Sequence, residues 1–262
     1  MTDHAAEHTR RRMPVWGFVV VVLVYLALIQ GLGLFLTRDT PIVYAGPTTV
    51  NELWRSITLP VGASLVFVGL VVAALRWWRP VARDDRPVRR WVLAVPVIML
   101  AIAVLAVNYG GLADRGPGFT VLLLLSTLLV GFAEEGMFRG IGIAVFRDNG
   151  FTEAKVALWS TVVFGLAHAT NLISTGPKAF VQVLVAALSG YFLYLIRRRT
   201  GGLLIPAIAH GLWDFSLISS SVRPGQGYFG PLLNVLGLVV LTIVVLVRRR
   251  HIEPEAHHGN PG

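Results

Sequence analysis

The sequence contains no cysteine and few charged residues. Charged side chains make up 14% of its 262 residues. The absence of cysteine excludes disulfides, thiolate metal sites and cysteine nucleophiles. No apolar run of the sequence holds an HExxH or HxxEH stretch, so the usual helical zinc signature is missing there, and the sequence has no GxSxG of the serine hydrolases. We also find no internal repeat and no second domain.

Hydrophobic residues dominate what is present. They form 55% of the chain, and the mean hydropathy is +0.67. A soluble domain of this size could not cover so much apolar surface, so the composition indicates a polytopic membrane protein. The net charge is +9. The basic residues lie in short clusters between apolar runs, which is typical of membrane topology and not of a nucleic-acid interface.

The apolar runs predict an all-α helical bundle with about eight transmembrane helices. Each run approaches the ~20 residues that a membrane span needs. The predicted spans are residues 15–36, 58–77, 91–108, 119–146, 153–173, 178–196, 203–221 and 229–247. The first run follows arginines, but it is too long for a signal peptide, so we interpret it as a retained helix.

Arginine and lysine are concentrated in every second connection between these spans. The rich connections hold Arg10–Arg12, Arg76–Arg90, Arg147 with Lys155, Arg197–Arg199 and Arg248–Arg250. The alternate connections hold only Arg38, Arg55, Arg115, Lys178 and Arg223. By the positive-inside rule, this alternation predicts a multi-pass protein of the cell membrane with both termini in the cytoplasm.

Residues 1–248 are predicted to form a single transmembrane domain. Its motif-bearing core is residues 119–221, because the three groups of charged and histidine residues that stand out within the spans lie there. Residues 249–262 are polar and are predicted to form a disordered tail.

Three groups of polar side chains interrupt the apolar runs of the core. Charged groups at this depth are costly and persist when they face a partner or a cavity. The groups are Glu134, Glu135 and Arg139 in "EEGMFRG", His168 in "FGLAH", and His210 with Asp214 in "AHGLWD".

Spacing divides the roles of the two glutamates. Glu135 and Arg139 are four residues apart, so they share a helix face and can form an ion pair. Glu134 is rotated by ~100° from Glu135, so it is predicted to face a different neighbour. At ~1.5 Å per residue, Glu134 and His168 each lie roughly 18 Å from the predicted cytoplasmic ends of their spans. We therefore expect a shared polar cavity, placed in the cytoplasmic half of the bundle.

A glutamate with histidines can activate water for amide hydrolysis. A carboxylate in a low-dielectric cavity suits a general base, and a histidine can stabilise the oxyanion that develops. No nucleophilic serine or cysteine is needed. A zinc site is the second option, since two histidines and a glutamate are suitable ligands. We favour a site without a cofactor, because the zinc signatures are missing.

The three groups also resemble the motifs of a known family. "EEGMFRG" has the form EExxxR, "FGLAH" has the form FxxxH, and "TGGLLIPAIAHGLWD" is similar to a third motif with a TG turn and HxxxN or HxxxD. In order and approximate spacing they resemble the membrane-embedded CAAX prenyl endopeptidases and their bacterial relatives, the CPBP (Abi) family. The resemblance covers about residues 119–220.

The resemblance implies an intramembrane endopeptidase that acts on a peptide or lipidated peptide from the membrane. It implies that Glu134, with His168, activates the attacking water, that Glu135 and Arg139 support the site, and that His210 and the residue four positions later stabilise the oxyanion. The prenyl endopeptidases have asparagine at that last position, where this chain has Asp214. We expect Asp214 to accept a hydrogen bond from His210 and to orient it. The alternatives are a non-enzymatic scaffold or immunity protein of the CPBP type and a proton-coupled transporter.

Overall fold

The computed structural model describes residues 11–39, 46–172 and 176–254. Within these ranges the chain is helical between short connections and has no strand, so the predicted all-α class is confirmed. The longer helices are α2 (Val15–Thr37), α4 (Leu59–Leu75), α6 (Ala94–Ala106), α8 (Pro117–Glu134), α10 (Glu153–Ala167), α12 (Ala179–Thr200), α13 (Leu204–Ser219) and α14 (Gly230–Arg248). The shorter elements are α3 (Val50–Leu53), η1 (Trp54–Thr58), α5 (Trp78–Ala82), η2 (Arg90–Leu93), α7 (Tyr109–Arg115), η3 (Glu135–Gly142), α9 (Ile143–Asp148), η4 (His168–Asn171), η5 (Gly176–Lys178) and η6 (Arg249–His251).

Each of the eight predicted apolar segments contains a helix, but a count of eight spans is not confirmed. In the described residues, five helices are long and apolar enough to cross a membrane, and a sixth span results if α6 and α7, bent by 56°, are counted together. Helices α10 and α13 have only 15 and 16 residues. They fall short of the ~20 residues of a span. Both short helices end within the bundle near the predicted site.

Helices α8 and α13 pack closely against each other. A Cβ atom built on Gly131 of α8 would lie 2.1 Å from the carbonyl oxygen of Ala207 on α13. A Cβ atom on Gly211 of α13 would in turn lie 2.8 Å from Cα of Leu128 on α8. Small residues permit such close approach between helices in membranes. The two glycines therefore set the distance between the helix of Glu134 and the helix of His210.

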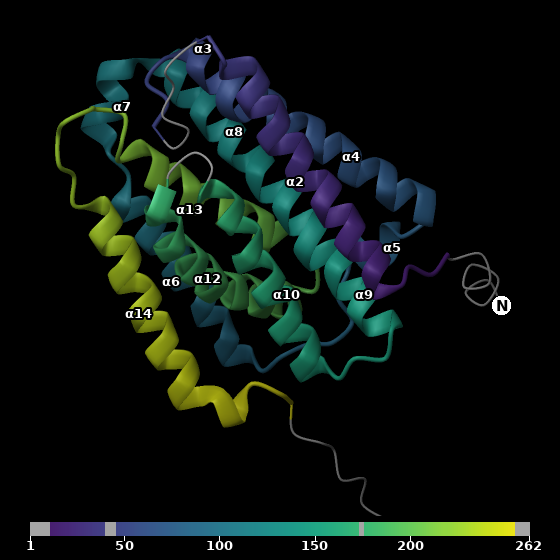
Figure 1. The fold of residues 1–262 in the computed structure, drawn as a ribbon. Helices are drawn as coiled ribbons and strands as arrows, with labels where there is room; N and C mark the ends of the chain where they lie inside the picture. Colours follow the sequence, from purple (N-terminus) through teal and green to yellow (C-terminus); the bar gives the residue numbers. More distant parts are fainter. Residues whose placement is uncertain (1–10, 40–45, 173–175, 255–262) are drawn as a thin grey trace, which may run out of the picture.

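The arginine-rich connections meet at one end of the bundle, near the N-terminus, α5 and α9 (Figure 1). There the turn after α12 pairs with the connection after α5. Gly201 has φ of +73°, in the left-handed region that glycine favours, and its carbonyl accepts from the amide of Asp84. A Cβ atom on Gly202 would lie 2.6 Å from the carbonyl oxygen of Ala82. These contacts give the TG turn of the third motif a structural role.

Three of the charges at this end form a buried cluster. Asp84 is bound by Arg197 at 3.1 Å and by Arg147 at 3.0 Å. The Arg197 side chain is fully buried and also donates to the carbonyl oxygens of Pro80 and Val81. The sequence analysis assigned these arginines to topology alone, and this was incomplete. Arg197 ties α12 to the connection before α6 and closes this end of the bundle.

The start of the predicted tail packs against the bundle. Residues 249–254 are described, and they begin with the short helix η6. The Glu253 carboxylate accepts two hydrogen bonds from Arg198, at 2.7 and 2.8 Å. This double contact anchors the segment to α12. Arg10 and residues 255–262, which the sequence analysis also considered, lie outside the described residues.

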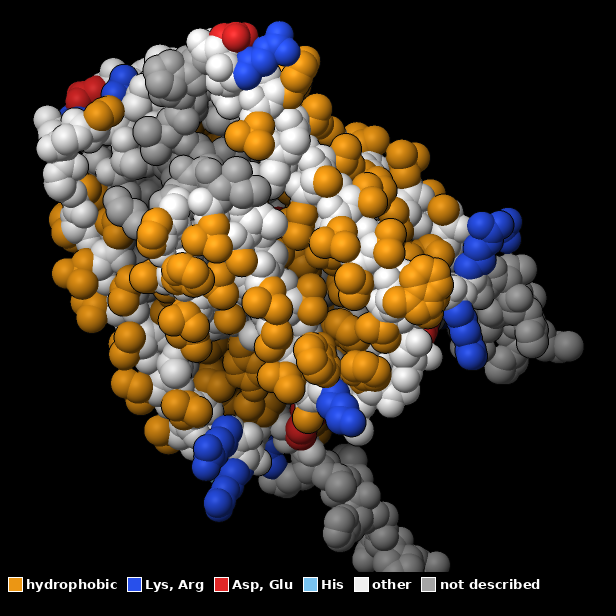
Figure 2. Space-filling view, in the orientation of Figure 1, with side chains coloured by type: hydrophobic (Ala, Val, Ile, Leu, Met, Phe, Trp, Pro, Cys, Tyr) orange, Lys and Arg blue, Asp and Glu red, His pale blue; other side chains and the backbone are white. Residues whose placement is uncertain are grey.

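Hydrophobic side chains cover the middle of the face seen in Figure 2, and lysine and arginine side chains lie towards its ends. Large apolar residues such as Val66, Leu70 and Leu184 are about two-thirds exposed in the isolated chain. An apolar belt between charged ends is the surface that a lipid bilayer covers. The chain is therefore a membrane-embedded helical protein.

We predict that Gly131→Ala destabilises the protein, because the added methyl group meets the backbone of α13. Overpacking of this kind costs ~1–3 kcal/mol. The midpoint of thermal unfolding in detergent should fall. Gly69→Ala is the matched control, since a Cβ atom at Gly69 meets nothing within 4 Å. Equal midpoints for the two variants would contradict the close packing of α8 on α13.

Candidate functional site

The first motif lies where the long helix changes from an α-helix to a π-helix. Helix α8 ends at Glu134, and the π-helix η3 follows with every residue buried. π-Helical turns are rare and often occur at functional sites. Neighbouring side chains lie close to its glycines: a Cβ atom on Gly140 would lie 2.7 Å from Val81, and one on Gly142 would lie 2.9 Å from Phe18. The wide turn is thus enclosed by α2 and α5.

The predicted ion pair between Glu135 and Arg139 is present. Arg139 Nη1 lies 2.9 Å from Glu135 Oε1, and both side chains are fully buried. The guanidinium also lies over the ring of Phe164, with 3.9 Å between Cζ and the ring centroid. Gly190 on α12 leaves room for it, since a Cβ atom there would lie 2.7 Å from Arg139 Nη2. Three elements, η3, α10 and α12, therefore enclose this one cation.

Glu135 also holds His210. The Nδ1 atom of His210 lies 3.0 Å from Glu135 Oε1. Because this carboxylate is paired with Arg139, we assign the proton of that hydrogen bond to Nδ1. The other ring nitrogen, Nε2, faces two further carboxylates, with 3.5 Å to Asp214 Oδ2 and 3.8 Å to Glu134 Oε2. The His210 ring is thus fixed by the hydrogen bond that it donates to Glu135, whereas the sequence analysis expected Asp214 to accept it.

His168 is fixed by its own helix. Its Nδ1 lies 2.9 Å from the carbonyl oxygen of Phe164. A carbonyl can only accept, so Nδ1 carries the proton and the Nε2 of a neutral ring is an acceptor. This Nε2 lies 3.9 Å from Glu134 Oε2. The Phe164 ring packs edge-on against both histidines, with centroids 4.8 Å from His168 and 5.7 Å from His210.

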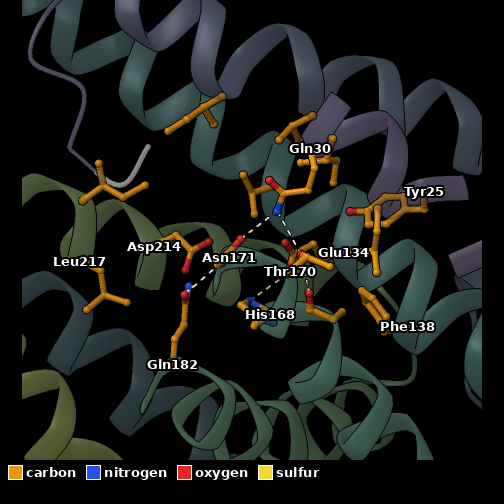
Figure 3. Close-up of a pocket in the computed structure, with 17 residues that line it drawn as sticks. Tyr25, Gln30, Glu134, Phe138, His168, Thr170, Asn171, Gln182, Asp214 and Leu217 are labelled. Atoms are coloured by element: carbon orange, nitrogen blue, oxygen red, sulfur yellow. Dashed lines mark hydrogen bonds and ion pairs between the residues drawn. The ribbon is translucent and has the colours of Figure 1, made fainter. Parts of the chain in front are cut away.

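Glu134, His168 and Asp214 line one cavity of about 280 Å³ (Figure 3). The size approaches that of small ligand sites. One wall is apolar. It is formed by Leu26, Ile29, Ile57, Val61, Val130, Phe138, Leu217 and Ile218. Glu134 Oε2 has no hydrogen-bond partner among the side chains that the structure describes. Glu135 forms an ion pair with Arg139, and Glu134 faces the cavity, as the spacing predicted.

A row of uncharged polar side chains completes the cavity, and the sequence analysis missed it. Gln30 Nε2 donates to Thr170 Oγ1 and to Asn171 Oδ1, each at 3.0 Å. Asn171 Nδ2 donates to Gln182 Oε1, also at 3.0 Å. Figure 3 shows this chain of contacts running from α2 across η4 to α12. Gln30 was the available signal, because it is an amide within a long apolar run.

The structure thus brings all six predicted site residues into one cluster. Their chemical roles stay predictions. The part of the chain that the structure describes contains no group of three or more His, Cys, Asp or Glu side chains arranged to hold a metal ion. A site without a cofactor stays a prediction, and we derive no step through a metal.

The fold and this cluster define a membrane-embedded helical protein with a buried carboxylate–histidine site. Residues 116–216 match the family model described as "Type II CAAX prenyl endopeptidase Rce1-like". The match covers the motif-bearing part of the chain and confirms the resemblance found in the sequence. Residues before 116 and after 216 lie outside the match. No curated protein and no solved structure matches the chain.

Proposed function

We propose that this protein is an intramembrane endopeptidase in which Glu134 activates a water molecule. One observation carries the proposal: Glu134 Oε2 and His168 Nε2 face the same cavity, 3.9 Å apart. Both atoms are acceptors when His168 is neutral. A water molecule between them would donate a hydrogen to each, which leaves its lone pair directed at a substrate carbonyl.

In the proposed reaction Glu134 takes a proton from this water, and the oxygen adds to the carbonyl carbon of the scissile peptide bond. A tetrahedral oxyanion forms. Glu134 then delivers the proton to the leaving nitrogen as the carbon–nitrogen bond breaks. His168 holds the water, because its Nδ1 proton is committed to the Phe164 carbonyl. No covalent intermediate with the protein is required.

His210 is placed to stabilise the oxyanion. Three carboxylates lie within 4 Å of its ring, those of Glu134, Glu135 and Asp214. Arg139 is the one arginine in this cluster. A protonated His210 would supply a second positive charge and would donate from Nε2 into the cavity while Nδ1 stays on Glu135. In this role Asp214 supports the charge of His210.

The substrate would be a peptide or lipidated peptide segment next to the membrane. The apolar wall of the cavity suits uncharged side chains or a lipid group. The bilayer is the other partner of the protein, which we place in the cell membrane with its termini and arginine-rich end in the cytoplasm. No metal or organic cofactor takes part.

We predict that Glu134→Gln abolishes peptide cleavage while the protein still folds. The amide keeps the shape of the side chain but cannot accept the proton of the water. Loss of a general base costs ~10²–10⁴-fold in rate. The measurement is cleavage of a peptide library by purified protein in detergent, followed by mass spectrometry.

Asp85→Asn is the control for Glu134→Gln, because it removes an exposed carboxylate at the arginine-rich end. It should cleave as the unchanged protein does. Activity of Glu134→Gln within a few-fold of the control would show that another group activates the water. If no variant and no unchanged protein cleaves any peptide, the scaffold alternative replaces the enzyme.

We predict that Asp214→Asn lowers the cleavage rate by ~10-fold or more, as the loss of a supporting carboxylate does at other sites. Asparagine keeps the shape but removes the negative charge 3.5 Å from His210 Nε2. The rate should be measured across pH with the same peptide. Unchanged or higher activity, with an optimum broadened to alkaline pH, would instead indicate that Asp214 acts as a neutral donor to the oxyanion.

A further inference from the structure

The cavity extends towards the end of the bundle that lies opposite the arginine-rich connections. Ile57 of η1 lines it three residues from Trp54, or ~5 Å along the helix. Measured along the helices that join them, Ile57 lies ~30 Å from Trp78, which is at the arginine-rich end. On α12, the lining residue Gln182 is the fourth residue of a helix that ends at Thr200. The cavity thus reaches from the middle of the bundle, where Glu134 lies, towards the helix ends remote from the arginines.

Exposed aromatic side chains mark both ends of the apolar belt. Trp16 and Trp78 are 72% and 62% exposed near the arginine-rich end, and Trp54 and Tyr109 are 44% and 61% exposed near the opposite end. Tryptophan and tyrosine are enriched where a helix crosses the membrane interface. Ile57 therefore lies just inside the interface that is remote from the arginines.

The arginine-rich side of the site is filled. Every residue from Glu135 to Phe146 is buried, so η3 and most of α9 are packed on all sides. Leu193 and Arg197 on α12 are buried at the same end. Arg197 and its partner Asp84 form the last layer.

Among the residues that the structure describes, uncharged polar side chains lie across the remote side of the cavity. Helix α2 packs against α4, η1, η3 and α9, and hydrogen bonds from Gln30 join it to η4. Asn171 and Gln182 continue this rim. Side-chain amides carry a donor and an acceptor, as a peptide group does. The rim therefore matches the backbone of an extended, uncharged peptide, and a peptide that binds there replaces hydrogen bonds that the rim now makes to itself.

We propose that the catalytic cavity is reached from the face opposite the arginine-rich connections, through the rim formed by Gln30, Thr170, Asn171 and Gln182. With the arginines in the cytoplasm, its substrate is an extended peptide segment at the outer surface of the membrane. The nature of the substrate rests on the proposed function. The side of access does not, because it can be measured without catalysis.

The absence of cysteine makes a direct test possible. Single cysteines are introduced in the inactive Glu134→Gln background, at Leu217 in the cavity, at Gln226 on the remote end and at Arg83 on the arginine-rich end. A charged maleimide that cannot cross membranes is added to intact expressing cells and, separately, to permeabilised cells. We expect Leu217→Cys and Gln226→Cys to react in intact cells and Arg83→Cys to react only after permeabilisation. Val145→Cys, at a fully buried position of α9, should stay unlabelled in both.

Three results would overturn the proposal. If Leu217→Cys, like Arg83→Cys, reacts only after permeabilisation, the cavity is reached from the arginine-rich side. If Leu217→Cys reacts only with a membrane-soluble maleimide, access is from the bilayer. Labelling of Arg83→Cys in intact cells would reverse the topology and would move the substrate to the cytoplasm. None of these results depends on cleavage, so failure of this inference is distinct from failure of the proposed function.

Discussion

A single buried carboxylate, Glu135, holds the site together. One of its oxygens accepts from Arg139 at 2.9 Å and from His210 at 3.0 Å, so it links η3 to α13. Burying charge is costly, and a pair of this kind adds little net stability compared with apolar residues. Removing one partner is much worse, because it leaves the other charge uncompensated. With Glu135 committed in this way, Glu134 keeps a carboxylate oxygen directed at the cavity.

Packing around this carboxylate depends on positions without side chains. Gly131 and Gly211 bring α8 against α13, and Gly190 makes room for the guanidinium of Arg139. Helices α10 and α13 are shorter than a membrane span and carry the two histidines. The buried layer of Asp84 and Arg197 closes one end of the bundle, and a rim of amides lies at the other. The site therefore lies between tightly packed side chains at one end of the bundle and a polar cavity at the other.

Local spacing made part of this structure predictable. The apolar runs gave the helices, and the spacing of Glu135 and Arg139 gave their ion pair, because both depend on neighbours in the same helix. Contacts between distant segments were not accessible. Nothing in the sequence indicated that Arg197 is buried on Asp84, that Glu135 orients His210, or that part of the first motif is π-helical. The count of eight spans is not confirmed for the same reason, since tertiary packing decides where the short helices end.

The central claim is that two adjacent glutamates have different roles: Glu135 is structural, and Glu134 faces the cavity. Thermal unfolding in one detergent tests this claim most directly. Glu135→Gln removes the charge that compensates Arg139 in the protein interior, whereas Glu134→Gln changes only the lining of a cavity. The account predicts that Glu135→Gln lowers the free energy of unfolding by ~3–5 kcal/mol, the usual cost of breaking a buried pair. Glu134→Gln should leave it nearly unchanged. Equal losses for the two variants, or a larger loss for Glu134→Gln, would contradict the account.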